Sequence, residues 1–469
     1  SLHDALPILA GFAKTKVLQP KEVQELTICF EQKQFASYQE EECAWVMESG
    51  KYGIWIGKDS ASVKLAAVVD VPETTIIEKT NRVCPKKAAF QDMKSSEYTK
   101  NKEQQWLALA KETNPMTLSF LPRKENTRTI PEPTLANQQP VDELIPLLYG
   151  NITKNSSTLG SSGIRVPGSA GETTEALEEH YGIRSLIMAD GPAGLRLRQS
   201  YEVDRQTDTV YGAGVLGSLE NGFLEEMEHH NDADTYYQYC TAFPVGTALA
   251  QTWDLELMET FGRAIAAEME EFHVDLWLAP GMNIQRNPLC GRNFEYFSED
   301  PFLSGMLAAA ITKGVQSRKG CGVTLKHFAC NNQEDNRMEV DACVSQRALR
   351  EIYFRGFEIA VKKSEPMALM SSYNQINGIH AANSSDLCTV VARGEWGFDG
   401  VIMSDWNTTV PEDGSVPWKC AAAGNDLIMP GNPEDDNDIR KAYQQGNLSE
   451  EQIRSCAGRI LAMVAKLTI

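Results

Sequence analysis

The sequence lacks several patterns that would assign it to a common class. Its 11 cysteines include no CxxC pair and no Cys/His cluster at the spacing of a zinc site, so nothing indicates a structural metal or a disulfide framework. No apolar run is long enough to span a bilayer. Basic residues are also scarce: 44 Lys and Arg stand against 64 Asp and Glu, a formal charge of -20. We therefore expect neither nucleic acid nor a membrane as a partner.

The remaining composition is that of a globular enzyme-sized chain. With 469 residues, 42% of them hydrophobic, two domains are expected. Scattered cysteines in a chain of this size are typical of reduced thiols, and no signal peptide is visible. These features favour a bacterial, cytoplasmic location. The sequence gives no indication of the oligomeric state.

The first 160 residues form three segments of different composition. Residues 1–8, "SLHDALPI", match the in-frame translation of a widely used sequencing adapter, and we expect them to be an artefact; the alternative is a native N-terminus. Residues 9–85 contain apolar residues at every second position in "ELTICFE" (25–31) and "KYGIWIGK" (51–58). This period predicts a small antiparallel β-sandwich. Residues 86–160 are polar and rich in turn residues, which predicts a linker with wrapping loops and one helix near 101–112.

From residue 161 to residue 469 the pattern becomes that of alternating strands and helices. Six short apolar runs end on polar or small residues, at 185–190, 274–281, 322–328, 367–374, 400–406 and 425–431. Helical periodicity covers 254–272, 345–363 and 449–467; Ser345 is expected to be an N-cap, and Ser449, followed by Glu450 and Glu451, to open a capping box.

Repeated βα units of this kind predict an α/β fold, a (β/α)8-type TIM barrel preceded by the partial β-sandwich. A seventh strand is expected near 241–246, and the eighth is not identified. A doubly wound sheet is the alternative, although no GxGxxG follows any of the strands.

Polar side chains occupy the ends of these strands. In a barrel, Asp190, Lys326, His327, Tyr373 and Asp405 would converge on one rim, because the carboxyl ends of parallel strands meet there. Carboxylates and cations can form paired hydrogen bonds with hydroxyl groups, and aromatic rings can stack on the C–H faces of a sugar. The combination suits a neutral, polyhydroxylated ligand, with no metal or cofactor.

Five segments in series resemble glycoside hydrolase family 3, in its β-glucosidase branch: "ADGPAGLRL", "NIQRNPLCGRNFEYFSEDP", "TLKHFACNNQEDNR", "MSSYNQING" and "GVIMSDW". The resemblance implies a retaining exo-β-glycosidase that releases terminal β-D-glucosyl residues, with Asp405 as the nucleophile. It implies substrate binding by Asp190, Arg196, Arg292, Lys326, His327, Tyr373 and Trp406. The "KH(F/P)PGHG" loop of the N-acetylglucosaminidase branch is absent, since "KHFACNNQ" stands in its place.

The resemblance also implies that part of the active site is missing. In most members the acid/base Glu lies in a separate α/β sandwich domain. Residues 9–85 resemble the end of the family's fibronectin-III-like domain, as in a subgroup whose domains are rotated in order, with the α/β sandwich first. We therefore expect the acid/base to lie upstream of this sequence and the present chain to be nearly inactive as a hydrolase.

Less specific interpretations remain open. Asp405 could cap a helix, Lys326 and His327 could form a buried ion-pair cluster, Trp406 could be core, and Cys330 is expected to be inert. Glu295, Glu299 and Asp300 are expected to form structural salt bridges, although one of them could be the acid/base. The acidic insertion at 199–240 is expected to be a solvated loop, or to border the aglycone side.

Two alternative functions also remain open. One is a β-xylosidase or α-L-arabinofuranosidase of the same family, since glucose specificity needs a partner for the C6 hydroxymethyl group, a role for which Asp190 is suited. The other is a non-catalytic sugar-binding barrel.

Overall fold

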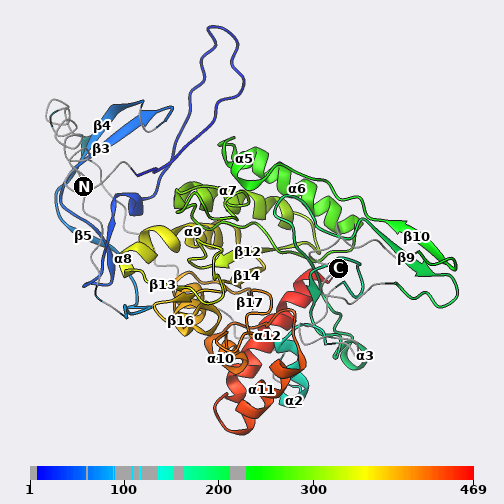
Figure 1. The fold of residues 1–469 in the computed structure, drawn as a ribbon. Helices are drawn as coiled ribbons and strands as arrows, with labels where there is room; N and C mark the ends of the chain where they lie inside the picture. Colours follow the sequence, from blue (N-terminus) through cyan, green and yellow to red (C-terminus); the bar gives the residue numbers. More distant parts are fainter. Residues whose placement is uncertain are drawn as a thin grey trace. The chain divides into compact units, whose positions relative to one another are not determined.

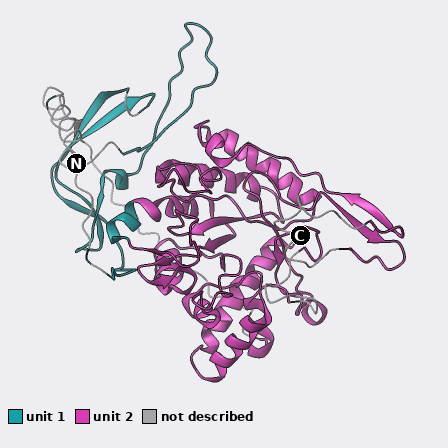
Figure 2. Ribbon diagram, in the orientation of Figure 1, with its two compact units in different colours: residues 1–128, 344–351 teal, residues 129–343, 352–469 magenta. Residues whose placement is uncertain are grey.

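The computed structural model describes residues 8–59, 62–87, 89, 108, 116–117, 136, 138–152, 163–211 and 229–468. The chain divides into two compact units, residues 1–128 with 344–351 and residues 129–343 with 352–469 (Figure 2). Residues 1–7 and nearly all of the helix predicted at 101–112 lie outside the described residues. No described helix combines the length and the apolar character needed to cross a bilayer.

Unit 1 contains two small sheets. One has the order β1-β2-β5, with β1 at Ser37–Gln39, β2 at Ala44–Met47 and β5 at Thr75–Lys79. The other has the order β3-β4-β6, with β3 at Gly50–Gly57, β4 at Val63–Val71 and β6 at Met116–Thr117. Apart from the parallel β4–β6 pair, all of these pairings are antiparallel. The buried core of this unit includes Tyr38, Trp45, Met47 and Tyr52. The strand predicted over 51–58 is confirmed, because β3 spans Gly50–Gly57.

The strand predicted over 25–31 is wrong. These residues form no strand, and Leu26, Ile28 and Phe30 are between 36% and 39% exposed. A period of two places apolar side chains on one side of an extended chain, but a strand also needs a neighbour to complete its hydrogen bonds. Within the described residues no segment pairs with 25–31.

Unit 2 is built around a six-stranded sheet in the order β17-β14-β12-β11-β8-β7. Its strands are β7 (Gly171–Glu172), β8 (Ile187–Ala189), β11 (Leu276–Trp277), β12 (Gly322–Phe328), β14 (Ala368–Ser371) and β17 (Val401–Ser404). All neighbours are parallel except β7 and β8. Single bridges continue the pairing from Met403 to Leu427, from Ile428 to Tyr149 and from Gly150 to Thr173, next to β7.

This architecture is TIM-barrel-like, with three differences from the predicted regular repeat. Strand β7 is antiparallel to its neighbour, and residues 241–245 are irregular instead of forming the seventh strand. Pro244 in this segment has no N–H to donate to a sheet ladder, which explains why an apolar stretch is not a strand here. The run at 425–431 contributes only the bridges of Leu427 and Ile428.

The helices of unit 2 surround this sheet (Figure 1). Helices α6 (Leu255–Glu271), α7 (Pro301–Gln316) and α9 (Arg355–Ser364) pack side by side, and α10 (Pro417–Ala423), α11 (Pro433–Gln444) and α12 (Glu450–Leu467) form a second group. Shorter elements are α2 (Val141–Leu144), η3 (Ile145–Leu148), α3 (Glu178–Tyr181), α5 (Gly246–Ala250), β13 (Asp341–Ala342), β15 (Gln375–Ile376), β16 (Ile379–His380), η5 (Ala381–Asn383) and η6 (Asp386–Glu395). Unit 1 also contains η1 (Gln32–Phe35) and α8 (Gln346–Ala348), while η4 (Leu349–Tyr353) precedes α9.

The helices predicted at 254–272 and 449–467 are confirmed as α6 and α12, whereas the one predicted at 345–363 is divided into α8, η4 and α9. Asp254 caps α6 by accepting from the N–H of Leu257, and Ser345 caps α8 by accepting from the N–H of Ala348. Ser449 opens a capping box on α12, with Gln452 as its reciprocal partner. These caps satisfy N–H groups that a helix start leaves without an internal partner.

The acidic insertion is not simply a loop. Residues Ser200–Asp204 form β9 and residues Ala233–Tyr237 form β10, and the two strands pair antiparallel as an isolated ribbon. In Figure 1 this ribbon extends outward from the rest of unit 2.

Candidate functional site

The predicted site residues follow, or lie in, neighbouring strands of the unit 2 sheet. Asp190 comes directly after β8, Lys326 and His327 lie in β12, Tyr373 follows β14 and Asp405 follows β17. Arg292 lies in the irregular segment after β11, and Trp406 is next to Asp405. The carboxyl ends of β8, β11, β12, β14 and β17 therefore supply these side chains at one edge of the sheet.

Asp190 is held by two cations. Its Oδ1 lies 2.5 Å from Nζ of Lys326, and its Oδ2 lies 2.5 Å from Nη2 of Arg196. Burial by itself would raise the pKa of Asp190, but Lys326 and Arg196 outweigh it and lower the pKa to about 2. The carboxylate is thus ionised at any ordinary pH. It forms a fixed, charged hydrogen-bond acceptor, and the side chain of Lys326 is only 4% exposed.

Asp405 has a different environment. It is 7% exposed; its Oδ1 accepts from the backbone N–H of Trp406 at 2.8 Å, and its Oδ2 lies 3.7 Å from Nε2 of His327. Within the described residues, Oδ2 accepts no hydrogen bond. The interpretation of Asp405 as a helix cap is wrong, because the chain turns after it and the next helix starts at Pro417, with Val416 as its N-cap.

The cations near Asp405 do not hold its pKa low. Burial is the largest influence and raises the pKa above its ordinary value, although Arg292 and Lys326 act in the opposite direction. A carboxylate that has lost most of its hydration and has one oxygen without a hydrogen bond is a poorly stabilised anion. Such an oxygen is suited to nucleophilic attack.

His327 is a neutral neighbour of Asp405. The side chain is buried, and burial, together with Arg292 and Lys326, lowers its pKa well below the ordinary value. The backbone of His327 is fixed by Asn283, whose Oδ1 accepts from its N–H at 2.7 Å and whose Nδ2 donates to its carbonyl at 2.8 Å. Of the predicted ion-pair cluster, Lys326 forms a pair with Asp190, whereas His327 remains an uncharged hydrogen-bonding group.

Two arginines add positive charge. Arg292 forms an ion pair with Glu295, and its charge acts on both Asp190 and Asp405. Arg337 lies with its guanidinium carbon 4.8 Å from the centre of the Tyr373 ring, and its charge also lowers the pKa of Asp405. Arg337 is absent from the residues predicted from sequence. A signal was present in the sequence, since Arg337 is the last residue of the segment "TLKHFACNNQEDNR" and stands ten residues after His327.

Tyr373 and Trp406 are fixed by hydrogen bonds to the backbone. The hydroxyl of Tyr373 donates to the carbonyl of Trp406 at 2.7 Å, and Nε1 of Trp406 donates to the carbonyl of Ala170 at 2.9 Å. Burial and the charge of Asp405 raise the pKa of Tyr373 well above its ordinary value, so its phenol keeps its proton. Trp406 is partly buried and packs against the core of unit 2, so packing accounts for part of its environment.

The acidic residues between 295 and 300 differ in what their side chains contact. Glu295 pairs with Arg292, as expected for a structural salt bridge. Asp300 instead caps α7, accepting from the N–H of Leu303 at 2.8 Å, and Glu299 forms no ion pair within the described chain. Cys330 is buried.

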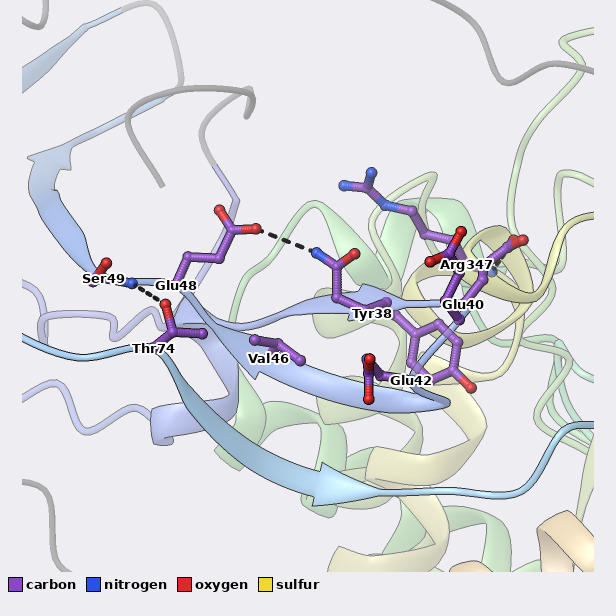
Figure 3. Close-up of a pocket in the computed structure, with 10 residues that line it drawn as sticks. Tyr38, Glu40, Glu42, Val46, Glu48, Ser49, Thr74 and Arg347 are labelled. Atoms are coloured by element: carbon purple, nitrogen blue, oxygen red, sulfur yellow. Dashed lines mark hydrogen bonds between the residues drawn. The ribbon is translucent and has the colours of Figure 1, made fainter.

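A separate hollow lies in unit 1 and contains none of the predicted site residues. It measures about 700 Å³, and its lining includes Tyr38, Glu40, Glu42, Glu48 and Arg347 (Figure 3). Glu40 accepts from the backbone N–H of Arg347 at 3.0 Å, so part of its acidic lining is already engaged. Across the described parts of both units, no three His, Cys, Asp or Glu side chains are grouped so as to hold a metal ion.

Fold and site together define the class of this protein. It is an α/β, barrel-like protein in which the predicted site residues lie at, or follow, the carboxyl ends of parallel strands.

Comparison with known sequences is more specific. The model of the glycosyl hydrolase family 3 N-terminal domain matches residues 228–463, and that of the fibronectin type III-like domain matches residues 4–60. Because the first match covers half of the chain, this chain belongs to glycosyl hydrolase family 3.

Individual relatives agree with this assignment. A β-glucosidase of Ruminococcus albus is 35% identical over 99% of this chain and 47% of its own length. An exo-α-(1→6)-L-arabinopyranosidase of Bifidobacterium longum is 42% identical over 61% of this chain and 34% of its own length. Among solved structures, a β-glucosidase from Paenibacillus barengoltzii has a TM-score of 0.73 and 29% identity, covering 98% of this chain and 50% of that one. The chain thus spans about half the length of the Ruminococcus albus and Paenibacillus barengoltzii proteins.

Proposed function

We propose that this chain forms the nucleophile-bearing part of a retaining β-glucosidase active site. One observation carries the proposal: Asp405 is buried at a strand end, and its Oδ2 accepts no hydrogen bond from the described residues. Glu172, Glu295 and Glu334 also have one buried oxygen without a hydrogen bond, but each forms an ion pair with an arginine, whereas the charged-pair distance found for Asp405 among the described residues is that to His327. An oxygen left free beside a neutral His327 is available for attack on a sugar.

The reaction would proceed by double displacement. Oδ2 of Asp405 attacks the anomeric carbon, the bond to the leaving oxygen breaks, and a glycosyl ester forms; water then releases the sugar with its original anomeric configuration. Arg292, Lys326 and Arg337 offset part of the cost of the charged nucleophile. Tyr373 and Trp406, both fixed to backbone carbonyls, would position the nucleophile and form part of the subsite wall.

Sugar binding is assigned to the residues around Asp190. A carboxylate fixed by Lys326 and Arg196 can accept from two hydroxyls, while the same cations donate to neighbouring oxygens. Asp190 would bind hydroxyls at the non-reducing end, including that on C6, and Arg292 and His327 the remaining hydroxyls of the ring.

The acid/base carboxyl is proposed to come from residues outside those described here. A general acid must hold a proton when the leaving group departs. The other carboxylates around the site are Asp190, Glu295 and Glu334, and each is paired with a cation, Lys326, Arg292 or Arg337 respectively. That arrangement suits positioning groups better than proton donors.

Covalent trapping tests the proposal without needing the acid. A 2-deoxy-2-fluoro-β-D-glucoside with a dinitrophenolate leaving group should label the chain once, and peptide mass mapping should place the sugar on Asp405. Asp405→Asn should abolish the label, whereas Asp413→Asn, a control at an exposed carboxylate eight residues further on, should not. A folded chain that remains unlabelled would contradict the proposal and support a non-catalytic sugar-binding barrel.

A second candidate is a pentopyranosidase, which the similarity to arabinopyranosidases supports. Pentopyranosides lack the C6 hydroxymethyl group that Asp190 is proposed to bind. Labelling rates with the matching fluorinated β-D-xyloside and α-L-arabinopyranoside would decide between the candidates. Faster labelling by either pentoside than by the glucoside would favour the second candidate, or the β-xylosidase activity considered from sequence.

A further inference from the structure

The ribbon of β9 and β10 carries an unusual set of exposed aromatic side chains. Tyr236 is 50% exposed, Tyr237 59% and Tyr239 65%. Because Tyr201 and Tyr236 are directly opposite in the ladder, they lie on one face of the ribbon. Their rings are stacked with centroids 5.6 Å apart and an angle of 16° between planes. Tyr237 and Tyr239 form a second stacked pair, with values of 5.4 Å and 10°.

These tyrosines do not serve an obvious packing purpose. Large aromatic rings usually stabilise a fold through buried area, yet the rings on β10 leave at least half of their surface in water. Residue Ser200, the ladder partner of Tyr237, is too small to cover it. Both pairs instead present flat, apolar surfaces with polar hydroxyl edges.

The base of the ribbon is firmly attached to unit 2. Gln238, between the two exposed tyrosines, is buried, and its Nε2 donates to the carbonyls of Pro167 at 2.9 Å and Arg198 at 3.0 Å. Thr241, just beyond, donates its N–H to the carboxylate of Glu268 in α6 at 3.1 Å. The stacked pair of Tyr237 and Tyr239 is therefore held in place.

The ribbon also follows part of the candidate site closely in sequence. Strand β9 starts four residues after Arg196, which binds Asp190, and the carbonyl of Arg198 anchors Gln238. Asp190, Arg196, Arg198 and the first residue of the ribbon therefore lie on ten or so consecutive residues.

We propose that the exposed tyrosines of this ribbon bind a neutral β-linked glucan chain. In β-linked glucose the ring substituents are equatorial, so each sugar has two flat C–H faces that stack well on an aromatic ring. A chain with net charge -20 disfavours anionic polysaccharides. The proposal rests on the proposed function for the identity of the sugar, and it adds a binding surface outside the pocket that holds the terminal residue.

Native gel electrophoresis with and without soluble mixed-linkage β-glucan tests this binding. The unaltered chain should be retarded by the glucan. Tyr237→Ser combined with Tyr239→Ser should weaken the apparent affinity by about tenfold or more, because two stacking faces are lost. Tyr236→Ser is a milder second variant, expected to weaken it severalfold. Tyr181→Ser, at a tyrosine that is 43% exposed on α3, is the matched control and should behave as the parent.

The outcomes separate this proposal from the proposed function. Asp405→Asn should lose covalent labelling and keep the retardation, since the ribbon is untouched. Labelling of the parent without any retardation, or retardation unchanged in all ribbon variants with unaltered thermal unfolding, would overturn the ribbon proposal alone. A change in sedimentation coefficient in the tyrosine variants, with glucan binding unaltered, would also overturn it and indicate that the tyrosines join two copies of the chain.

Discussion

Replacing each of the two site aspartates by asparagine should change the stability of the protein in opposite directions. Asp190→Asn should destabilise it, because Lys326 and Arg196 lower the pKa of Asp190 from 3.8 to about 2. That difference corresponds to about 2.5 kcal/mol of folding free energy at neutral pH. The substitution also leaves Lys326, whose side chain is 4% exposed, without its counter-charge, so the loss should be at least this large.

Asp405→Asn should increase stability at neutral pH. Burial raises the pKa of Asp405, so its ionised form is disfavoured in the folded state. A raised pKa means that the contribution of Asp405 to stability is present at low pH and is lost as the pH rises through that pKa. An amide has nearly the same shape, can still accept from the N–H of Trp406 and carries no charge. A gain in stability on replacing the proposed nucleophile would match the trade-off between stability and activity that active sites commonly show.

Urea unfolding followed by circular dichroism measures both effects. At pH 7 the midpoint should fall for Asp190→Asn and rise for Asp405→Asn, with the exposed Asp413→Asn as control. The gain from Asp405→Asn should shrink as the pH is lowered through the pKa of Asp405. The contribution of Asp190 should survive until the pH falls below about 4. If Asp405→Asn destabilises the protein as much as Asp190→Asn does, the reasoning about the burial of Asp405 is refuted.

Three further predictions concern other contacts. Arg337→Gln should raise the pKa of Asp405, since the charge of Arg337 lowers it, and so move the acid limb of the labelling rate to higher pH; an unchanged profile would exclude this electrostatic influence. Asp426→Asn should cost about 3–5 kcal/mol in urea unfolding, because Asp426 is buried between Arg393 and Arg459; a cost below 1 kcal/mol would contradict this. Ser449→Ala should cost about 1 kcal/mol through loss of the α12 cap, and rescue by Asp would confirm the capping role.

Local pattern determined which parts of the fold were predictable. Short apolar runs predicted the strands at 187–189, 322–328 and 401–404. Helical periodicity and recognisable N-caps predicted the helices at 255–271 and 450–467. Pairing between distant segments has no such signal. The bridges of Tyr149 to Ile428 and Gly150 to Thr173 depend on two-residue contacts, and the extended segment 25–31 has the pattern of a strand without a partner.

In the candidate site, too, local sequence features were predictable and effects of distant segments were not. Residue identity and strand position predicted Asp190, Lys326, His327, Tyr373 and Asp405 as neighbours at one sheet edge. The direction of the pKa shift at Asp405 could not be predicted, because burial outweighs visible neighbouring charges. Arg337 was missed although it ends the segment "TLKHFACNNQEDNR". It lies nine residues beyond the end of β12, where local periodicity does not determine the path of the chain. The ribbon was not predicted, because the acidic residues of 199–240 favoured a solvated loop over two five-residue strands.

The bridges that continue the unit 2 sheet limit how the gene can be shortened. Tyr149 and Gly150 stand between Ile428 and Thr173, although they precede β7 in sequence by about twenty residues. A trimmed version starting after position 150 would leave open strand edges on both sides of the gap, and such edges promote aggregation. Any expression trial aimed at unit 2 alone should therefore retain residues 138–152.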